Sequence, residues 1–253
     1  MAEAARVKSL TDFTLGQATG PTIVYLDVSA GDEPSRRLHI ELFDEELPYT
    51  TGNFRMLCTG ETAGWFSFSI HLTDELVVAP GERKGSAKVK ALYYKLTPFH
   101  RIIPGFMMQG GDITHGNGAG GASAYSRIFE DEFPLQGLSC PRGLASPDVH
   151  SIFLLFKHQV GSVSMAHQNH SNKSQFFISF LPASWCDGKH VVFGQVLAED
   201  LAHLAAFEAL GTSSGLPRVP VVIADCGQLC GDGYISAPAM PTPTSTTNIP
   251  TKP

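Results

Sequence analysis

The residues best suited to chemistry lie in one short stretch, residues 99–112 (FHRIIPGFMMQGGD). The residue types predict a short strand, a turn at the Pro-Gly pair and a second strand. Because side chains alternate across a strand, Arg101 and His100 point to opposite faces. Phe106 and Met107 follow the turn, so the stretch places a permanently charged guanidinium beside an apolar surface. In an isolated hairpin these residues could equally be ordinary surface residues, and the rest of the chain must decide.

The chain lacks the signatures of nucleophilic or metal-assisted hydrolysis. It contains no GxSxG elbow, no HExxH motif and no His/Cys set at metal-binding spacing, so we expect no metal site. Four histidines have no obvious partner spacing and are expected at the surface or in loops: His71, His115, His158 and His203.

The glycine-rich stretch GNGAGG (116–121) formally matches the GxGxxG dinucleotide-binding fingerprint. That fingerprint needs a preceding strand and a following helix, and residues 122–129 show no convincing helical face. The glycines instead indicate a tight loop that lets the backbone approach a ligand or another loop. We therefore expect no cofactor.

Composition narrows the class of protein. With 253 residues and 43% hydrophobic content the chain can bury a large core, and its net charge of -6 gives no basic surface for nucleic acid. No apolar run is long enough to span a bilayer, and the first residues lack the apolar segment of a secretory signal. The five cysteines are odd in number and show no CxxC spacing. We expect reduced thiols and a cytoplasmic location, with the nucleus as the alternative.

Short β-branched and aromatic runs separated by turn residues indicate a mainly β protein. Predicted strands cover residues 22–28, 37–43, 99–103, 106–109, 161–166, 175–180, 191–197 and 219–226. We expect two short helices, one opened by Pro48 and closed by Gly60, the other from Glu199 to Leu210. About eight strands without a βαβ rhythm predict a closed eight-stranded antiparallel β-barrel capped by the two short helices.

The predicted organisation is a flexible N-terminal arm (1–20), one barrel domain (21–230) and a disordered Pro/Thr-rich tail (231–253). Two segments interrupt the domain, at about 62–82 and 133–152. Long surface insertions cost little closure entropy, so both can be genuine. They could equally be translated introns.

Eight sequence blocks carry a family resemblance. They are GNFRMLCTGE (52–61), FHRIIPGFMMQGGDIT (99–114), NGAGG (117–121), FEDE (129–132), SMA (164–166), SQFFI (174–178), WCDGKHVVFG (185–194) and IADCGQL (223–229). In this order and spacing the chain resembles the cyclophilins, which are peptidyl-prolyl cis-trans isomerases. The resemblance implies an eight-stranded antiparallel barrel closed by two helices, with a substrate groove along one outer face.

The resemblance also implies a set of site residues. The family's catalytic arginine falls on Arg101, and its proline pocket falls on Phe106, Met107, Phe177 and Cys186. The remaining matched positions hold the substrate backbone, orient the arginine or form the rim: His100, Gln109, Ala166, His167, Gln175, Trp185 and His190. The tryptophan position is the one associated with cyclosporin binding, so cyclosporin A is the expected inhibitor.

Three features depart from the family pattern. His167 stands where cyclophilins usually carry asparagine, but the family contact there is made by the backbone. Cys186 replaces the common leucine and is expected to loosen the ring pocket slightly. The loop over residues 168–174 is one residue shorter than the common pattern.

We therefore expect a monomeric enzyme that accelerates rotation about X-Pro bonds in proline-containing peptides and proteins. Amide rotation is opposed by ~18–20 kcal/mol because the nitrogen lone pair is delocalised. An arginine N–H aimed at the prolyl nitrogen would weaken that conjugation without proton transfer. The alternative is an adaptor that binds proline peptides with little turnover, although a pure binder has less need of Arg101.

Overall fold

The computed structural model describes residues 21–61, 92–125, 128–132, 156–167, 171–230 and 233–235. The predicted arm, both predicted insertions and most of the predicted tail lie outside these residues, so their assignments stay predictions.

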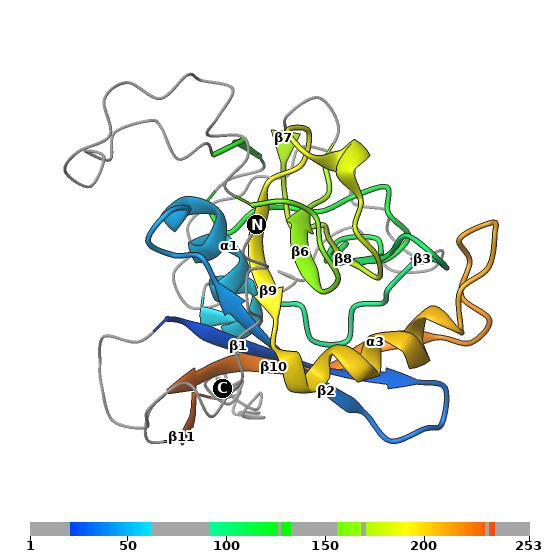
Figure 1. Cartoon of the computed structure of the whole chain (residues 1–253). Helices are drawn as coiled ribbons and strands as arrows, with labels where there is room; N and C mark the ends of the chain where they lie inside the picture. Colours follow the sequence, from blue (N-terminus) through cyan, green and yellow to red (C-terminus); the bar gives the residue numbers. More distant parts are fainter. Residues whose placement is uncertain are drawn as a thin grey trace, which may run out of the picture.

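Nine strands form one sheet. In chain order they are β1 (Ile23–Ala30), β2 (Arg36–Leu42), β3 (Arg101–Ile103), β4 (Met107–Gly110), β6 (Ser162–Met165), β8 (Phe176–Ser179), β9 (Val192–Val196), β10 (Val221–Cys230) and β11 (Gly233–Ile235). Their spatial order is β11-β10-β1-β2-β9-β6-β8-β4-β3, and every pairing is antiparallel (Figure 1). A separate pair joins β5 (Phe129–Glu130) to β7 (Ser171–Asn172).

The ends of the sheet meet through the segment that precedes β3. Pro98 forms an isolated antiparallel bridge with Val222 of β10. Phe99 N donates to Val221 O at 2.8 Å, on the same strand. A proline offers no N–H, and Leu96 has a positive φ of 67°, so this segment does not continue as a regular ladder.

The predicted mainly β, antiparallel, two-helix fold is confirmed, with a correction to the barrel. The described part of the sheet has nine strands instead of eight. Its closure joins β10 to the segment before β3, through one bridge and three backbone hydrogen bonds of residues 96–99, instead of a continuous ladder. The added strand is β11, which pairs with the end of β10 within the predicted tail, so regular structure continues past residue 230.

The two helices cover the sheet where the sequence places them. α1 (Pro48–Thr59) has proline in its first turn and ends at Gly60, whose φ of 69° is left-handed. The predicted helix at 199–210 is a 3-10 turn, η4 (Ala198–Asp200), followed by α3 (Leu201–Glu208). No helix in the described ranges is long and apolar enough to cross a membrane.

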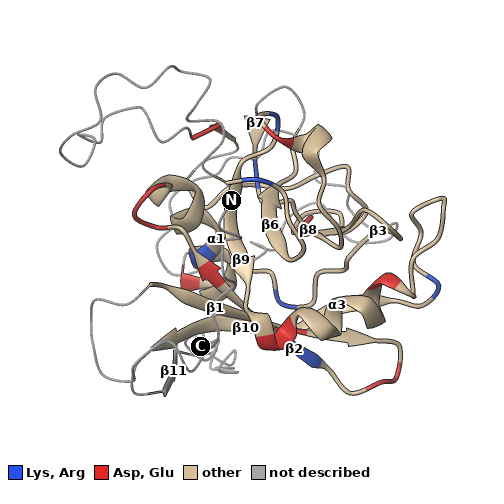
Figure 2. Ribbon diagram, viewed as in Figure 1, with Lys and Arg blue, Asp and Glu red and all other residues tan. Residues whose placement is uncertain are grey.

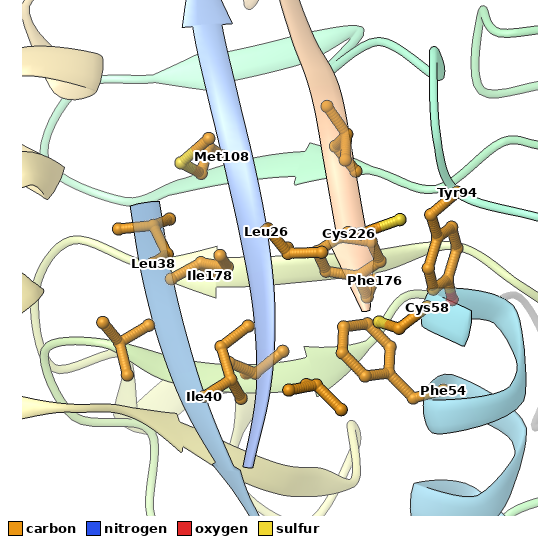
Figure 3. Packing of buried hydrophobic residues seen from close by; sticks show 14 of the residues in the cluster. Leu26, Leu38, Ile40, Phe54, Cys58, Tyr94, Met108, Phe176, Ile178 and Cys226 are labelled. Atoms are coloured by element: carbon orange, nitrogen blue, oxygen red, sulfur yellow. The ribbon is translucent and has the colours of Figure 1, made fainter. Parts of the chain in front are cut away.

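The core joins buried side chains of the sheet to those of both α1 and α3. Phe54 of α1 points at Phe176 of β8, with ring centroids 5.0 Å apart (Figure 3). Tyr94 and Phe99 approach the same Phe176 ring at 5.2 and 5.8 Å. Phe176 is fully buried. Because Phe177, its neighbour in the chain, must face the other side of the strand, the core fixes which side chains β8 presents outward.

The β3–β4 hairpin has the register that brings the chemical residues together. Arg101 of β3 stands opposite Gln109 of β4. Gly105 takes a positive φ of 74° in the connecting turn, and its N–H donates to the Glu208 carboxylate at 2.6 Å. The turn is therefore fastened to α3, which limits movement of the strand that carries Arg101.

Candidate active site

A groove of about 890 Å³ opens beside the β3–β4 hairpin. Every residue that the resemblance assigns to the site lines this groove, apart from His100. Six further residues line it. Gly118, Ala119 and Gly120 belong to the glycine-rich loop that the sequence predicts, whereas Ser171, Lys173 and Lys189 had no predicted site role. The groove therefore brings together residues from β3, β4, β8 and the loops around η3 (Ser184–Cys186).

One end of the groove is an apolar slot. The Phe106 ring lies 6.3 Å from the Phe177 ring and 5.5 Å from the Trp185 ring. Met107 and Cys186 are almost fully buried, whereas Trp185 is 56% exposed. Burial raises the pKa of the Cys186 thiol, so this side chain acts as a small neutral group in the slot. The slot combines a rigid floor with an open aromatic rim, as a ring-shaped ligand requires.

A chain of hydrogen bonds through two glutamine amides connects Arg101 to the glycine loop. The side-chain nitrogen of Gln175 donates to the carbonyls of Gly118 and Gly120, at 2.9 and 2.8 Å. Its oxygen must then face Gln109, whose nitrogen donates to it at 3.0 Å. This leaves the Gln109 oxygen to accept from Nη1 of Arg101, at 3.4 Å. The two glutamines are thus fixed in orientation, and together they orient the exposed guanidinium.

Asp112 holds the glycine loop that anchors this chain. One carboxylate oxygen accepts from Thr114 N, Thr114 Oγ1 and His115 N, all within 3.1 Å. The other accepts the backbone N–H groups of residues 117, 118 and 120, within 3.2 Å. Burial alone would raise the pKa of Asp112, but these hydrogen bonds outweigh it and hold the pKa well below its usual range. Sequence analysis gave this carboxylate no role. Its position directly before a glycine-rich loop was the available signal.

A buried histidine supports the floor of the slot from behind. The His158 ring stacks on Phe177, with the planes 5° apart. Its Nδ1 and its backbone N–H both meet the Asp187 carboxylate, at 2.7 and 2.9 Å. Burial lowers the pKa of His158, although the hydrogen bond and the charge of Asp187 oppose the shift. His158 lies in a loop, as predicted, but it is buried and not at the surface, because its partner Asp187 lies far along the chain.

The polar side of the groove is built around two more histidines. Nδ1 of His190 donates to the Met165 carbonyl at 3.0 Å, and the His190 ring lies edge-on to Phe177. His167 Nε2 lies 2.8 Å from the Lys189 carbonyl. Burial lowers the pKa of His190, and the neighbouring His167 adds to the effect. Ala166 N donates to the Gln175 carbonyl at 3.0 Å, which extends the pairing of β6 with β8 to the wall of the groove.

His100 does not line the groove. Its half-buried ring lies under the glycine loop, where a Cβ added to Gly118 would come within 2.7 Å of Nε2. Burial lowers the pKa of His100 and the positive charge of Arg101 also lowers it, against the effect of Asp112. Strand alternation explains the position, because Arg101 and His100 must face opposite ways. His100 therefore supports the loop instead of meeting a ligand.

The fold and groove geometry agree with a comparison against known families. The family model described as cyclophilin type peptidyl-prolyl cis-trans isomerase/CLD matches residues 25–228, from β1 to β10. The chain belongs to the cyclophilin family. It is a peptidyl-prolyl cis-trans isomerase, as the sequence predicts, and its family binds proline-containing peptides.

Asp112 provides a test of the loop anchor. We expect Asp112→Asn to lower the free energy of unfolding by ~1–3 kcal/mol at pH 7, because an amide cannot accept all the N–H groups that the carboxylate satisfies. The folded pKa of Asp112 lies below the ordinary unfolded value of ~3.9, so its stabilisation is present above about pH 4. It is lost as pH falls through the folded pKa. Urea unfolding at pH 7 and pH 3 measures this effect. The difference in the free energy of unfolding between the unaltered chain and Asp112→Asn should be smaller at pH 3 than at pH 7.

Asp32→Asn serves as the control, because Asp32 is exposed in the β1–β2 turn. It should change stability by less than about 0.5 kcal/mol at either pH. An equal loss for Asp112→Asn at both pH values would contradict the proposed anchoring by the ionised form.

Proposed function

We propose that Arg101 is the catalytic residue of this isomerase and that the apolar slot binds the substrate proline. The observation that carries the proposal is that the guanidinium and the slot share one groove. Arg101 is exposed and directed through Gln109, while the Phe106 and Phe177 ring centroids lie 6.3 Å apart in the same groove. A bound proline ring would then present its nitrogen to the guanidinium.

The proposed mechanism requires no covalent step. The cis and trans forms of an X-Pro bond differ by only about 0.5–1 kcal/mol, so the enzyme needs to lower the barrier and not to shift the equilibrium. A guanidinium N–H directed at the prolyl nitrogen favours a pyramidal nitrogen and withdraws its lone pair from the carbonyl. An acceleration on the order of 10⁴ corresponds to about 5–6 kcal/mol of preferential transition-state binding. One charge-assisted hydrogen bond and the positioning of the chain can supply it.

The other groove residues have positioning roles in this proposal. Gln109 and Gln175 aim the arginine, since each is fixed by the next amide along. The segment at Ala166 and His167 follows β6 and lines the groove, where an extended peptide can lie against it. Met107 and Cys186 fill the slot behind the ring, and His190 braces Phe177. His100 acts indirectly, through the glycine loop.

Arg101→Ala tests the proposed role. We expect kcat/KM for isomerisation to fall by about 10²–10³, with the peptide dissociation constant changed only a few-fold, because the slot remains. Arg101→Lys should recover little of the rate, since lysine lacks the planar fork that Gln109 orients. Protease-coupled isomerisation and fluorescence titration measure the two quantities. Arg218→Ala, at an exposed arginine outside the groove, is the control.

A different result would favour the adaptor function. If the unaltered chain binds proline peptides but shows no turnover, or if Arg101→Ala weakens binding as strongly as it lowers the rate, the proposed catalytic role is wrong.

We also propose that cyclosporin A binds this groove, with Trp185 at its rim. Trp185 is more than half exposed and contacts the Phe106 ring, so its fluorescence should respond to an apolar ligand. In a Trp65→Phe background, which leaves Trp185 as the single tryptophan, we expect a saturable change on titration. Trp185→Ala should weaken inhibition about tenfold or more. No saturable response, together with unimpaired isomerase activity in excess drug, would contradict the proposal.

For the cell we propose a monomer in the cytoplasm or nucleus. Cys58, Cys186 and Cys226 are free and buried, which suits a reducing compartment. Fractionation with immunoblotting should find the protein in these fractions, and maleimide should label these thiols only after denaturation. Recovery from the secretory fraction would contradict the proposal.

A further inference from the structure

The described lining of the groove carries charges of one sign. Arg101, Lys173 and Lys189 line it, and no aspartate or glutamate is among the described residues that do so. The whole chain, in contrast, has a net charge of -6. The positive groove is therefore a local feature and does not follow from composition.

Three carboxylates close to the groove are engaged by neighbouring donors. Asp112 is saturated by the N–H groups of the glycine loop. Asp187 accepts from the backbone and ring of His158, on the far side of Phe177. Asp131 accepts from Asn172 Nδ2 at 2.8 Å and lies 3.4 Å from His167 Nε2. Each negative charge is thus held by internal donors, while the cations face the groove.

The backbone of Lys173 is held in place beside the glycine loop. Its carbonyl accepts from Asn53 Nδ2 at 3.1 Å, and the next residue, Ser174, is tied to Tyr94 by a 2.6 Å hydrogen bond. Its Cβ lies only 3.4 Å from the position of a Cβ added to Gly121. Lys173 therefore stands beyond Gln175, on the opposite side of the glutamine pair from the aromatic slot.

Lys189 lies on another wall, close to the slot. Its N–H donates to the Cys186 carbonyl at 3.0 Å, and its own carbonyl meets His167. No ion pair recorded for the described residues involves Lys173 or Lys189. Figure 2 shows both basic and acidic segments close to β7, at this end of the molecule.

We propose that this groove selects proline peptides that carry an acidic side chain near the proline, with Lys173 and Lys189 as the specificity-determining residues. The inference rests on the proposed function, because it assumes that the proline occupies the aromatic slot. A carboxylate or a phosphate on the flanking residue would meet a lysine on either side of the bound ring. Both groups present the same negative oxygen chemistry, and the experiment separates them.

The test uses the full chain and a set of proline peptides. In each peptide one of the two positions before or the two positions after proline carries alanine, glutamate, lysine or phosphoserine. NMR exchange spectroscopy gives kcat/KM without a coupling protease. We expect glutamate at one or more positions to raise kcat/KM about threefold to fivefold over alanine at low salt, as one exposed charge pair can, and lysine to lower it. Phosphoserine should exceed glutamate if a phosphate is the preferred group. The preference should shrink at about 0.5 M salt, where the screening length falls well below 10 Å.

Lys173→Gln and Lys189→Gln should each bring the glutamate-to-alanine ratio toward one. Lys157→Gln is the matched control, because Lys157 is exposed and does not line the groove. A ratio near one for the unaltered chain at every position, or an equal fall of the ratio in Lys157→Gln, would overturn the inference. If no peptide is turned over, the proposed function fails, and dissociation constants of the same peptides still decide the acidic preference.

Discussion

A guanidinium can act on a bound amide only if the orientation of its N–H groups is fixed. In this protein a short chain of hydrogen bonds fixes the orientation of Arg101. It begins at the Asp112 carboxylate, which holds the backbone of the glycine loop. It continues from the loop carbonyls to Gln175, from there to Gln109, and ends at Arg101. Each hydrogen bond fixes which side of the next glutamine amide is the NH₂ donor and which is the oxygen acceptor. The exposed arginine is thus coupled to a nearly inaccessible carboxylate.

The barrel supplies the rigidity that this chain needs. Phe176 and Phe177 are adjacent, yet one packs against Phe54 in the core and the other forms the floor of the groove. A shift in the register of β8 would exchange these faces, so the core protects the slot. The His158–Asp187 pair braces the same floor from beneath. The positions of the two lysines follow from the same framework, since both arise from backbone held by hydrogen bonds.

Local patterns predicted much of this structure, and long-range contacts explain what they missed. The helix from Pro48 to Gly60 is recognisable because its signals lie within the element. The groove residues could be named because they fall within family blocks, although His100 turned out to lie behind the loop. The role of His158 was missed because its partner Asp187 is distant in sequence, and β11 was missed because it depends on pairing with β10. The position of Lys173 in the groove likewise follows from packing and not from any motif.

A crystal structure of the chain with a bound proline peptide would test the central claim most directly. We expect the proline ring between Phe106, Met107 and Phe177, with an Arg101 N–H directed at the prolyl nitrogen at hydrogen-bond distance, about 2.7–3.2 Å. A ring bound outside this slot, or a guanidinium turned away from the prolyl nitrogen, would contradict it.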